Sequence, residues 1–259
     1  MKAVILAGGL GTRLSEETSV KPKPMVEIGG MPVIWHIMKT YSHHGIDDFV
    51  VLGGYKSHAI KEYFANYATM SPTVRFDLGK GTTEILEGRS ESWTVTIVDT
   101  GATTMTGGRL RRAREHLKDE PFLLTYGDGV SDVDIGKLVA QHERDGAMVT
   151  LTAVQPPGRF GAITLEAGQT RIGSFREKPE GDGAWINGGY FVVQPEALEY
   201  IAGDDISWEQ EPLMRVANEG ALGAYRHSGF WQPMDTLRDK HYLEGLWQGG
   251  SPPWKVWDR

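Results

Sequence analysis

A short apolar run followed at once by three glycines constrains the fold of this chain more than any other feature. Residues Ala3 to Leu6 contain no polar side chain, which is typical of a parallel strand covered on both faces. Gly8, Gly9 and Gly11 follow in the next turn. Because glycines lack side chains, consecutive backbone N–H groups there can turn inward and bind phosphate oxygens. An ordinary tight turn uses the same residues, so this turn alone does not establish a ligand site.

Positive side chains lie close to the glycine-rich turn in the sequence. Arg13 carries a planar guanidinium that matches phosphate geometry, and Lys23 lies in a segment that prolines hold extended. The turn fits neither common nucleotide template, because Leu14 replaces the third Rossmann glycine and no Gly-Lys-Ser/Thr follows as in a P-loop. We predict a triphosphate site with Arg13 and Lys23 as catalytic cations, lined by Leu6, Ala7, Gly8, Gly9, Gly11, Thr12, Arg13 and Lys23.

Two motifs taken together resemble those of a known family. They are Gly-Gly-x-Gly-Thr-Arg-Leu at 8–14 and Pro-Lys-Pro at 22–24. The family is that of the nucleotidyltransferases that make nucleotide sugars, the sugar-1-phosphate pyrophosphorylases, and the resemblance extends over essentially the whole chain. It implies a Rossmann-like α/β fold with three αβα layers, and it implies that the bound triphosphate is a substrate.

Strand and helix patterns alternate along the first half of the chain. The expected elements are strands at 1–6, 48–54 and 74–78 and amphipathic helices at 31–45 and 56–68. This alternation predicts an α/β fold with a mixed, mostly parallel central sheet and helices on both faces. Residues 80–92 lack periodicity and are expected to form a loop excursion. We expect one domain over 1–259, with a nucleotide half at 1–130 and a sugar-phosphate half at 131–259.

The composition argues against several classes of protein. The sequence contains no cysteine, which excludes disulfides and thiolate metal sites and fits a reducing cytoplasm. A formal net charge of −7 argues against broad nucleic-acid binding. No apolar stretch reaches the roughly 18 residues that a membrane span needs. His36, His43 and His44 have no neighbouring carboxylate or cysteine to complete a metal site, so we expect them to be packed or solvated.

A second ligand loop is expected after a strand at 93–98. That strand leads into a hydroxyl-rich segment, and a helix is predicted to begin at Arg109 and end at Leu117. In the resembling family the corresponding loop reads the nucleobase, which implies that Thr104, Gly108 and Arg109 bind the nucleotide. From the residues alone, a glycine-bearing cap on a surface helix remains an alternative.

A Gly-Asp pair directly follows an apolar strand at 121–126. Asp128 should therefore emerge at the carboxyl end of a central strand, where open α/β sheets bind ligands. A carboxylate in that place suits Mg²⁺, which binds one or two carboxylates together with phosphate oxygens. The resemblance agrees, since the family uses this aspartate as a metal ligand. Asp132 and Asp134 precede a helix predicted at 135–144 and are expected to cap it.

The resemblance assigns two further motifs to the sugar phosphate. Glu177 and Lys178 stand in a Glu-Lys-Pro motif, and Asn187 and Gly188 lie at the start of a buried strand. The resemblance implies that Lys178 neutralises the incoming phosphate, while Glu177 and Asn187 bind sugar hydroxyls with Gly188 beside them. From the residues alone, Glu177 and Lys178 can equally form an ordinary exposed charge pair.

Asp235 follows an aromatic segment and precedes a helix predicted at 237–247. It is expected either to cap that helix or, as the resemblance implies, to bind Mg²⁺ together with Asp128. The resemblance favours the metal role, although the local sequence Gln-Pro-Met-Asp-Thr differs from the Asp-Ile-Gly-Thr of many superfamily members. Earlier in the chain, residues 207–210 form a capping-box pattern that opens a helix predicted to end at Asn218. The aromatic tail at 249–259 is expected to pack on this chain or on a neighbour.

The expected chemistry follows from charge. A nucleoside triphosphate and a sugar phosphate repel each other, so catalysis should consist of positioning and charge neutralisation. An ionised sugar-1-phosphate oxygen is expected to attack the α-phosphorus in line and expel pyrophosphate, with Mg²⁺ as cofactor. Within the family, the resemblance is closest to members that use CTP and glucose 1-phosphate to make CDP-glucose. It also implies a homo-oligomer, a hexamer, that supplies dideoxy sugars for bacterial surface polysaccharide.

Two alternatives remain open from the sequence. The first is the same chemistry with another base or sugar, for instance guanylyl transfer to mannose 1-phosphate, since those enzymes share the Pro-Lys-Pro segment. The second is a non-catalytic nucleotide-sugar sensor on the same fold. The set Arg13, Lys23, Asp128 and Asp235 argues against the sensor, because a protein that only binds has no need of two metal carboxylates.

Overall fold

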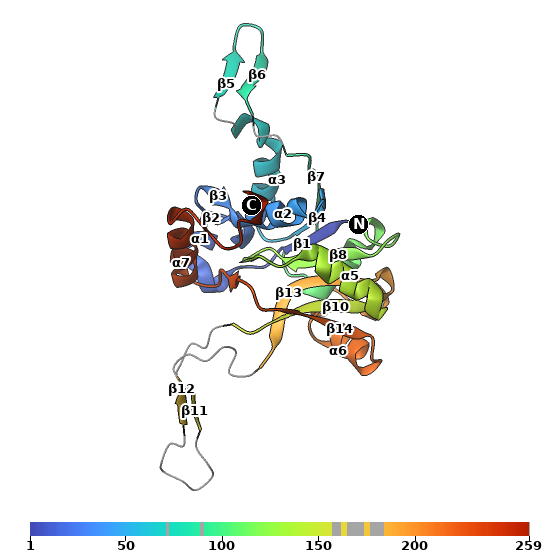
Figure 1. The fold of residues 1–259 in the computed structure, drawn as a ribbon. Coiled ribbons are helices and arrows are strands. Elements are labelled where there is room, and N and C mark those ends of the chain that lie inside the picture. The colour runs from blue at the N-terminus through green and yellow to red at the C-terminus, as the bar shows by residue number, and fades with distance from the viewer. Residues whose placement is uncertain (71–72, 89–90, 157–161, 165–173, 177–183, 259) are drawn as a thin grey trace.

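A seven-stranded sheet forms the centre of the molecule in the computed structural model, which describes residues 1–70, 73–88, 91–156, 162–164, 174–176 and 184–258 (Figure 1). In spatial order β14-β10-β13-β8-β1-β4-β7, its strands are Leu222–His227, Val149–Val154, Ile186–Val193, Phe122–Tyr126, Ala3–Ala7, Asp48–Gly53 and Thr94–Asp99. Only β13 among these seven runs antiparallel to its neighbours. The predicted mixed, mostly parallel sheet is confirmed.

Strand β1 lies at the middle of this sheet and fixes where the loops meet. Ala3 stands opposite Phe49 of β4 on one side and Leu123 of β8 on the other, and all five residues of β1 are buried. Burial on both faces explains the apolar run that the sequence shows. Because β1, β4 and β8 are parallel, the loops that follow Ala7, Gly53 and Tyr126 leave the sheet at one edge.

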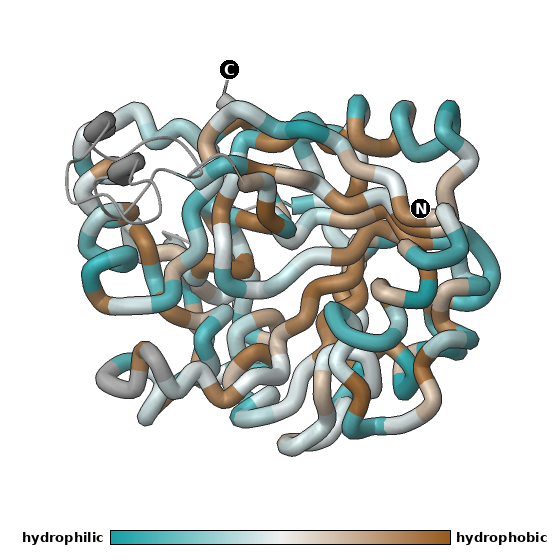
Figure 2. The backbone as a smooth tube through the Cα atoms, turned by 90° about the horizontal axis from the view of Figure 1, so that it is seen from below, coloured by the Kyte–Doolittle hydropathy of each residue, from teal (hydrophilic) through white to brown (hydrophobic). Residues whose placement is uncertain are grey.

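Helices cover both faces of the sheet, and each face has its own apolar core. One core contains side chains of α2 (Val33–His43), α3 (Ser57–Ala65), α5 (Ile135–Asp145) and α7 (Leu237–Gln248). The other contains side chains of α4 (Thr106–Arg112) and α6 (Glu211–Asn218). Figure 2 shows the hydrophobic positions gathered along the central strands. The predicted three layers are therefore present.

No helix within the described ranges combines the length and apolar character that crossing a membrane requires.

Four short strand pairs lie outside the central sheet. They are β2 (Glu27–Ile28) with β3 (Met31–Pro32), β5 (Thr73–Asp77) with β6 (Thr82–Glu87), β9 (Gly129–Ser131) with β15 (Trp231–Pro233), and β11 (Ala162–Thr164) with β12 (Ser174–Arg176). The β5–β6 hairpin projects from the body at the top of Figure 1. The loop predicted at 80–92 is wrong over β6, because a strand exposed on both faces has no apolar alternation to reveal it.

The aromatic tail packs against its own chain. Trp254 is fully buried, and its indole N–H donates to His36 Nδ1 at 3.3 Å. The other ring nitrogen of His36, Nε2, donates to the carbonyl oxygen of Ile28 at 2.9 Å. The rings of Trp35 and Trp247 meet His36 edge-on. Burial lowers the pKa of His36 to about 4, so this histidine is a neutral, packed group, as expected.

Candidate active site

A cavity of about 350 Å³ opens where the loops after β1 and β8 meet the start of α4. The predicted nucleotide-binding residues that line it are Leu6, Ala7, Gly8, Gly9, Gly11, Thr12, Lys23, Thr104, Arg109 and Asp128. Pro24, Met105, Thr106, Tyr126 and Gly127 complete the lining. The side chain of Arg13 and the residues Glu177 and Lys178 lie outside the described part of the chain. We refer to this cavity as the main pocket.

Lys23 joins two carboxylates at one side of the main pocket. Its Nζ lies 2.6 Å from Asp128 Oδ2 and 2.6 Å from Asp235 Oδ1, and only 8% of the residue is exposed. Burial by itself lowers the pKa of Lys23, but the charges and hydrogen bonds of Asp128 and Asp235 outweigh it. The pKa is therefore raised and the ammonium is charged. We call these three residues the charge centre.

A short ladder brings the two aspartates of the charge centre together. Gly129 of β9 pairs with Pro233 of β15, and the backbone N–H of Met234 donates to the carbonyl oxygen of Asp128 at 2.8 Å. Asp235 follows immediately after Met234 in the sequence. This pairing places residues more than 100 positions apart within reach of one lysine.

The helix-capping alternative for Asp235 is wrong. Helix α7 is capped by Thr236, whose hydroxyl accepts from the N–H of Asp239 while the Asp239 carboxylate accepts from the N–H of Thr236. Asp134 caps α5 as expected, accepting from the N–H of Lys137 at 2.9 Å. Asp132 does not cap that helix, and its carboxylate lies 3.1 Å from His227 Nε2.

The donor set of the charge centre fits Mg²⁺. Asp128 and Asp235 offer hard carboxylate oxygens, and both already converge on a single cation, Lys23. No group of three or more histidine, aspartate or glutamate side chains suited to a metal occurs in the part of the chain that the structure describes. A divalent ion held by the two aspartates would therefore take its other ligands from phosphate and water, as Mg²⁺ commonly does.

Arg109 lines the main pocket and ties together the loops that follow β1, β4 and β7. Its guanidinium donates to the carbonyl oxygens of Gly8 at 2.9 Å, Gly101 at 2.8 Å and Gly53 at 3.3 Å, and to Thr100 Oγ1 at 2.7 Å. These acceptors follow or end β1, β4 and β7. Burial lowers the pKa of Arg109, yet a guanidinium stays charged at any physiological pH. We call this arrangement the arginine tie.

The arginine tie explains the glycine at position 8. A Cβ atom on Gly8 would overlap the guanidinium of Arg109. The sequence predicted that Arg109 contacts the nucleobase, and this contact stays a prediction. What the structure adds is that most of its donors are directed to the main chain.

Gly108 does not line the main pocket, in contrast to its predicted place beside the base. Its own N–H donates to the carbonyl oxygen of Ile206 at 3.2 Å, and a Cβ atom would overlap the backbone of Asp204. Close packing of α4 against this segment accounts for the glycine. Helix α4 also begins at Thr106, three residues before its predicted start, so Gly108 lies within the helix.

The start of β13 carries Asn187 and Gly188, the predicted sugar-phosphate residues that the structure describes. Asn187 Oδ1 accepts from the N–H of Gly189 at 2.8 Å, and its Nδ2 donates to Tyr126 Oη at 3.3 Å. The carbonyl oxygen of Gly188 accepts from Trp231 Nε1 at 2.7 Å. Because β13 is antiparallel to β8, its first residues lie at the edge where β8 ends.

Two residues of this region were not singled out by the sequence. Tyr126 lines the main pocket and donates its hydroxyl proton to Glu209 Oε1 at 2.7 Å. The capping box predicted at 207–210 is wrong, because α6 begins at Glu211 and its N-cap residue, Gln210, makes no side-chain cap bond. The position of Tyr126, directly before Gly127-Asp128, is a signal that could have identified it. No comparable signal marks Glu209.

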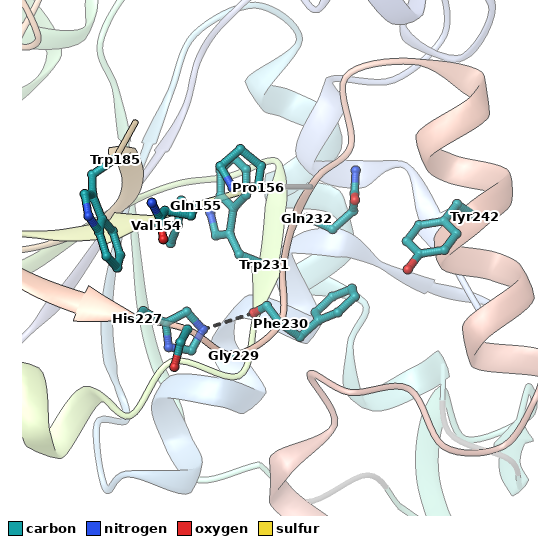
Figure 3. A pocket seen from close by; sticks show the side chains of 11 residues that line it. Val154, Gln155, Pro156, Trp185, His227, Gly229, Phe230, Trp231, Gln232 and Tyr242 are labelled. Carbon is teal, nitrogen blue, oxygen red and sulfur yellow. Dashed lines mark hydrogen bonds between the residues drawn. The ribbon is translucent and has the colours of Figure 1, made fainter. Parts of the chain in front are cut away.

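A second, aromatic cavity of about 180 Å³ lies beside β15 (Figure 3). Its walls include Trp185, Phe230, Trp231 and Tyr242. Figure 3 shows the His227 ring hydrogen-bonded to the carbonyl oxygen of Phe230, at 3.2 Å. Trp231 therefore connects the two regions, since its ring lines this cavity while its N–H binds the start of β13.

The geometry agrees with comparisons to known proteins. The family model described as nucleotidyl transferase matches residues 2–230. The chain belongs to this family. It is a nucleotidyltransferase, and the recognition made from the glycine-rich turn and Pro-Lys-Pro is confirmed at the level of the family.

Individual relatives of this family extend the comparison over the full length. The chain is 61% identical to a glucose-1-phosphate cytidylyltransferase of Salmonella typhi, over 100% of both chains. It is 42% identical to a probable glucose-1-phosphate cytidylyltransferase of Bacillus subtilis (strain 168), over 99% of this chain and 100% of the relative. The solved UDP-glucose pyrophosphorylase from Acinetobacter baumanii shares the fold, with a TM-score of 0.73, 17% identity and coverage of 99% and 96%. The Rossmann-like nucleotide-sugar transferase fold is thus confirmed.

Proposed function

We propose that this nucleotidyltransferase transfers the cytidylyl group of CTP to α-D-glucose 1-phosphate, giving CDP-glucose and pyrophosphate. The observation that carries the proposal is the charge centre: Lys23 between Asp128 and Asp235, at the wall of a pocket whose other wall is the glycine-rich turn. The 61% identity to the Salmonella typhi cytidylyltransferase supports the choice of both substrates.

The chain's own residues account for the binding of the two anions. Backbone N–H groups of the turn at Gly8, Gly9 and Gly11, with Arg13, would hold the triphosphate. The ammonium of Lys23 would neutralise charge between the α-phosphate and the incoming sugar phosphate, and its raised pKa keeps it charged for that role.

The reaction itself needs alignment more than a strong base. An oxygen of the sugar phosphate is ionised at neutral pH, so it can attack the α-phosphorus directly while the pyrophosphate oxygen leaves in line. The new P–O bond forms as the old one breaks, and no proton has to be removed. Asp128 and Asp235 would hold Mg²⁺, which would stabilise charge on the transferring phosphate.

Asn187 and Gly188 would bind the glucose 1-phosphate, with Glu177 and Lys178 as the further residues that the resemblance implies. Asn187 lies near the strand end that carries Asp128, since its amide donates to the hydroxyl of Tyr126, two residues before Asp128. Its Oδ1 and Nδ2 already have partners within the protein. We therefore expect Asn187 to bind the sugar through its remaining hydrogen-bonding capacity.

We propose further that the protein works as a homo-oligomer, the hexamer being the state that the resemblance implies. The supporting observation is the β5–β6 hairpin, which stands away from the body (Figure 1). Apolar side chains of this hairpin are exposed. Phe76 is 59% exposed and Leu78 is 91% exposed. A lone hairpin is only marginally stable in water, so a second copy covering it would stabilise it. Light scattering after gel filtration should give a mass several times that of one chain.

The proposed product suggests where the protein acts. A cysteine-free enzyme fits the reducing cytoplasm, and CDP-glucose would feed dideoxy-sugar synthesis for bacterial surface polysaccharide, as the resemblance implies.

The decisive experiment measures pyrophosphate release over a grid of nucleoside triphosphates and sugar 1-phosphates, with Mg²⁺. CTP with glucose 1-phosphate is expected to give the highest kcat/KM. A purine nucleotide with the highest value would contradict the proposed base, and mannose 1-phosphate with the highest value would contradict the proposed sugar. Ligand binding with no release for any pair would support the sensor instead.

A further inference from the structure

The carboxylate of Glu209 contacts two residues that line the main pocket, Tyr126 and Thr106. Its Oε1 accepts from Tyr126 Oη at 2.7 Å, and its Oε2 accepts from Thr106 Oγ1 at 2.7 Å. Tyr126 ends β8, two residues before Asp128, and Thr106 begins α4. Both of these partners line the main pocket. One side chain from the segment before α6 therefore links the strand on the sugar side with the helix on the nucleotide side.

The direction of every hydrogen bond around Glu209 is fixed. A carboxylate only accepts, so Tyr126 and Thr106 must both donate to it. Thr106 Oγ1 in turn accepts from the backbone N–H of Trp208 at 2.9 Å, and Tyr126 Oη accepts from Asn187 Nδ2. Burial and the charge of Glu209 raise the pKa of Tyr126, so the phenol keeps the proton that it donates.

The two ends of this network differ in rigidity. Thr106 is held from two sides, by Glu209 and by the main chain at Trp208, and it lies at the first turn of a helix. Among the described residues, the hydroxyl of Tyr126 has only side-chain partners, Glu209 and Asn187. Loss of the Glu209 carboxylate would thus leave the Thr106 end supported by the main chain, and it would free the Tyr126 hydroxyl to turn toward other acceptors.

We propose that Glu209 is a positioning residue that fixes Tyr126, and through it Asn187, for binding of the sugar phosphate. The inference deepens the proposed function and rests on it, since Asn187 is there a sugar-phosphate residue. Glu209 itself does not line the main pocket, so it acts through Tyr126 and touches no reacting atom. A purely structural role, fastening the segment before α6, is the alternative that the experiment has to separate.

The experiment compares Glu209→Ala, Glu209→Gln, Tyr126→Phe and the double variant Glu209→Ala/Tyr126→Phe. For Glu209→Ala, KM for glucose 1-phosphate is expected to rise roughly 5- to 20-fold, the scale of the net contribution of one hydrogen bond. KM for CTP should change less than about 2-fold, because the Thr106 end keeps its main-chain support. Glu209→Gln retains an acceptor for Tyr126 and should recover most of the loss.

The double variant tests whether Glu209 acts through Tyr126. If it does, removing Glu209 in the Tyr126→Phe background should raise KM for glucose 1-phosphate no further, whereas independent effects would multiply. Gln210→Ala is the matched control, since Gln210 is the exposed next residue and its side chain makes no cap bond. It should behave as the unmodified protein in every assay, and thermal unfolding checks that all variants fold.

Three results would overturn the inference. They are an unchanged KM for glucose 1-phosphate in Glu209→Ala, multiplying effects in the double variant, and equal rises in KM for both substrates together with a lower Tm. Failure of the proposed function would appear differently, as absence of CDP-glucose formation by the unmodified protein. In that case the same variants are compared with the sugar phosphate that the protein does use, or by calorimetric binding of the nucleotide sugar. A larger change for the sugar phosphate than for the nucleotide would again support the inference.

Discussion

Two buried cations lie at the main pocket, and folding satisfies them in opposite ways. Arg109 is 4% exposed and Lys23 is 8% exposed. The acceptors of Arg109 are neutral carbonyl and hydroxyl oxygens, and burial lowers its pKa. The partners of Lys23 are two carboxylates, which outweigh burial and raise its pKa. Equal burial therefore does not mean an equal role.

From this difference in partners we expect Arg109 to have a structural role and Lys23 to act on the bound ligands. Main-chain carbonyl oxygens are a permanent part of the fold, so the arginine tie holds the loops after β1, β4 and β7 in one arrangement. Carboxylates can exchange one cation for another when a ligand enters, so the charge centre can reorganise around phosphate. We expect substitutions of Arg109 to act mainly on stability and substitutions of Lys23 mainly on turnover.

The largest effect is expected for Lys23→Ala. Removing the ammonium leaves the two anions and the two aspartates without compensation, and kcat should fall about 10²- to 10³-fold, as for the loss of one preorganised donor. Pyrophosphate release measures the change. Lys137→Ala is the control, because it removes an exposed lysine of α5 that is paired with one aspartate, Asp134. Near-normal turnover in a folded Lys23→Ala protein would contradict the assignment.

The second largest effect is expected for Arg109→Ala, which should lower the stability of the fold. The five acceptors of Arg109, including the carbonyl oxygen of Ala102, lose their donor. We expect the free energy of unfolding to fall by about 3 kcal/mol. Arg109→Lys should not restore it, because a single ammonium cannot reach acceptors that surround a planar fork. Urea unfolding measures both variants. A lysine variant as stable as the unmodified protein would show that charge alone, and not the fork, holds the loops.

His36 differs from Arg109 and Lys23, because it is a buried group that is uncharged in the folded protein. Its pKa is about 4 in the folded protein against 6.5 when free, so the unfolded chain binds the extra proton between these values. Stability is therefore full above about pH 6.5 and falls as the pH decreases toward 4, by at most about 3 kcal/mol. Urea unfolding across this range should show the slope, and His36→Gln should reduce it. An unchanged slope in the variant would assign the pH dependence to other groups.

The smallest effect tests the contact between the glycine-rich turn and the arginine tie. Gly8→Ala should cost about 1–3 kcal/mol of stability, since the new methyl group overlaps the Arg109 guanidinium. Gly9→Ala is the matched control for stability, because a Cβ atom there meets no atom within 4 Å. Thermal or urea unfolding gives both values. Equal stability of the two variants would mean that the guanidinium moves aside without loss.

Local patterns account for what the sequence could predict. The apolar run of β1, the glycines after it and the Gly-Asp pair after β8 are each contained in a few consecutive residues. A buried central strand and the ligand edge at its end follow from such runs directly. Asp235 needed the family resemblance, because its partner Lys23 is 212 positions away.

Of three features that the sequence did not predict, two depend on contacts between residues far apart in the chain. Glu209 lies in a segment whose sequence is typical of a capping box. Its side chain instead accepts a hydrogen bond from Tyr126, 83 positions away. The backbone of Asp204 leaves no space for a side chain at Gly108. Strand β6 is exposed on both faces, so periodicity could not mark it. In the cases of Glu209 and Gly108, tertiary packing overrides a local rule.

The contact between Trp254 and His36 has a consequence for how the protein is made. The two residues are 218 positions apart, and the core beneath α2 includes the indole of Trp254. During synthesis, α2 leaves the ribosome long before this indole exists, and contacts of such long sequence separation form late. The part of the core that the Trp254 indole fills beneath α2 therefore stays incomplete until Trp254 itself has been made.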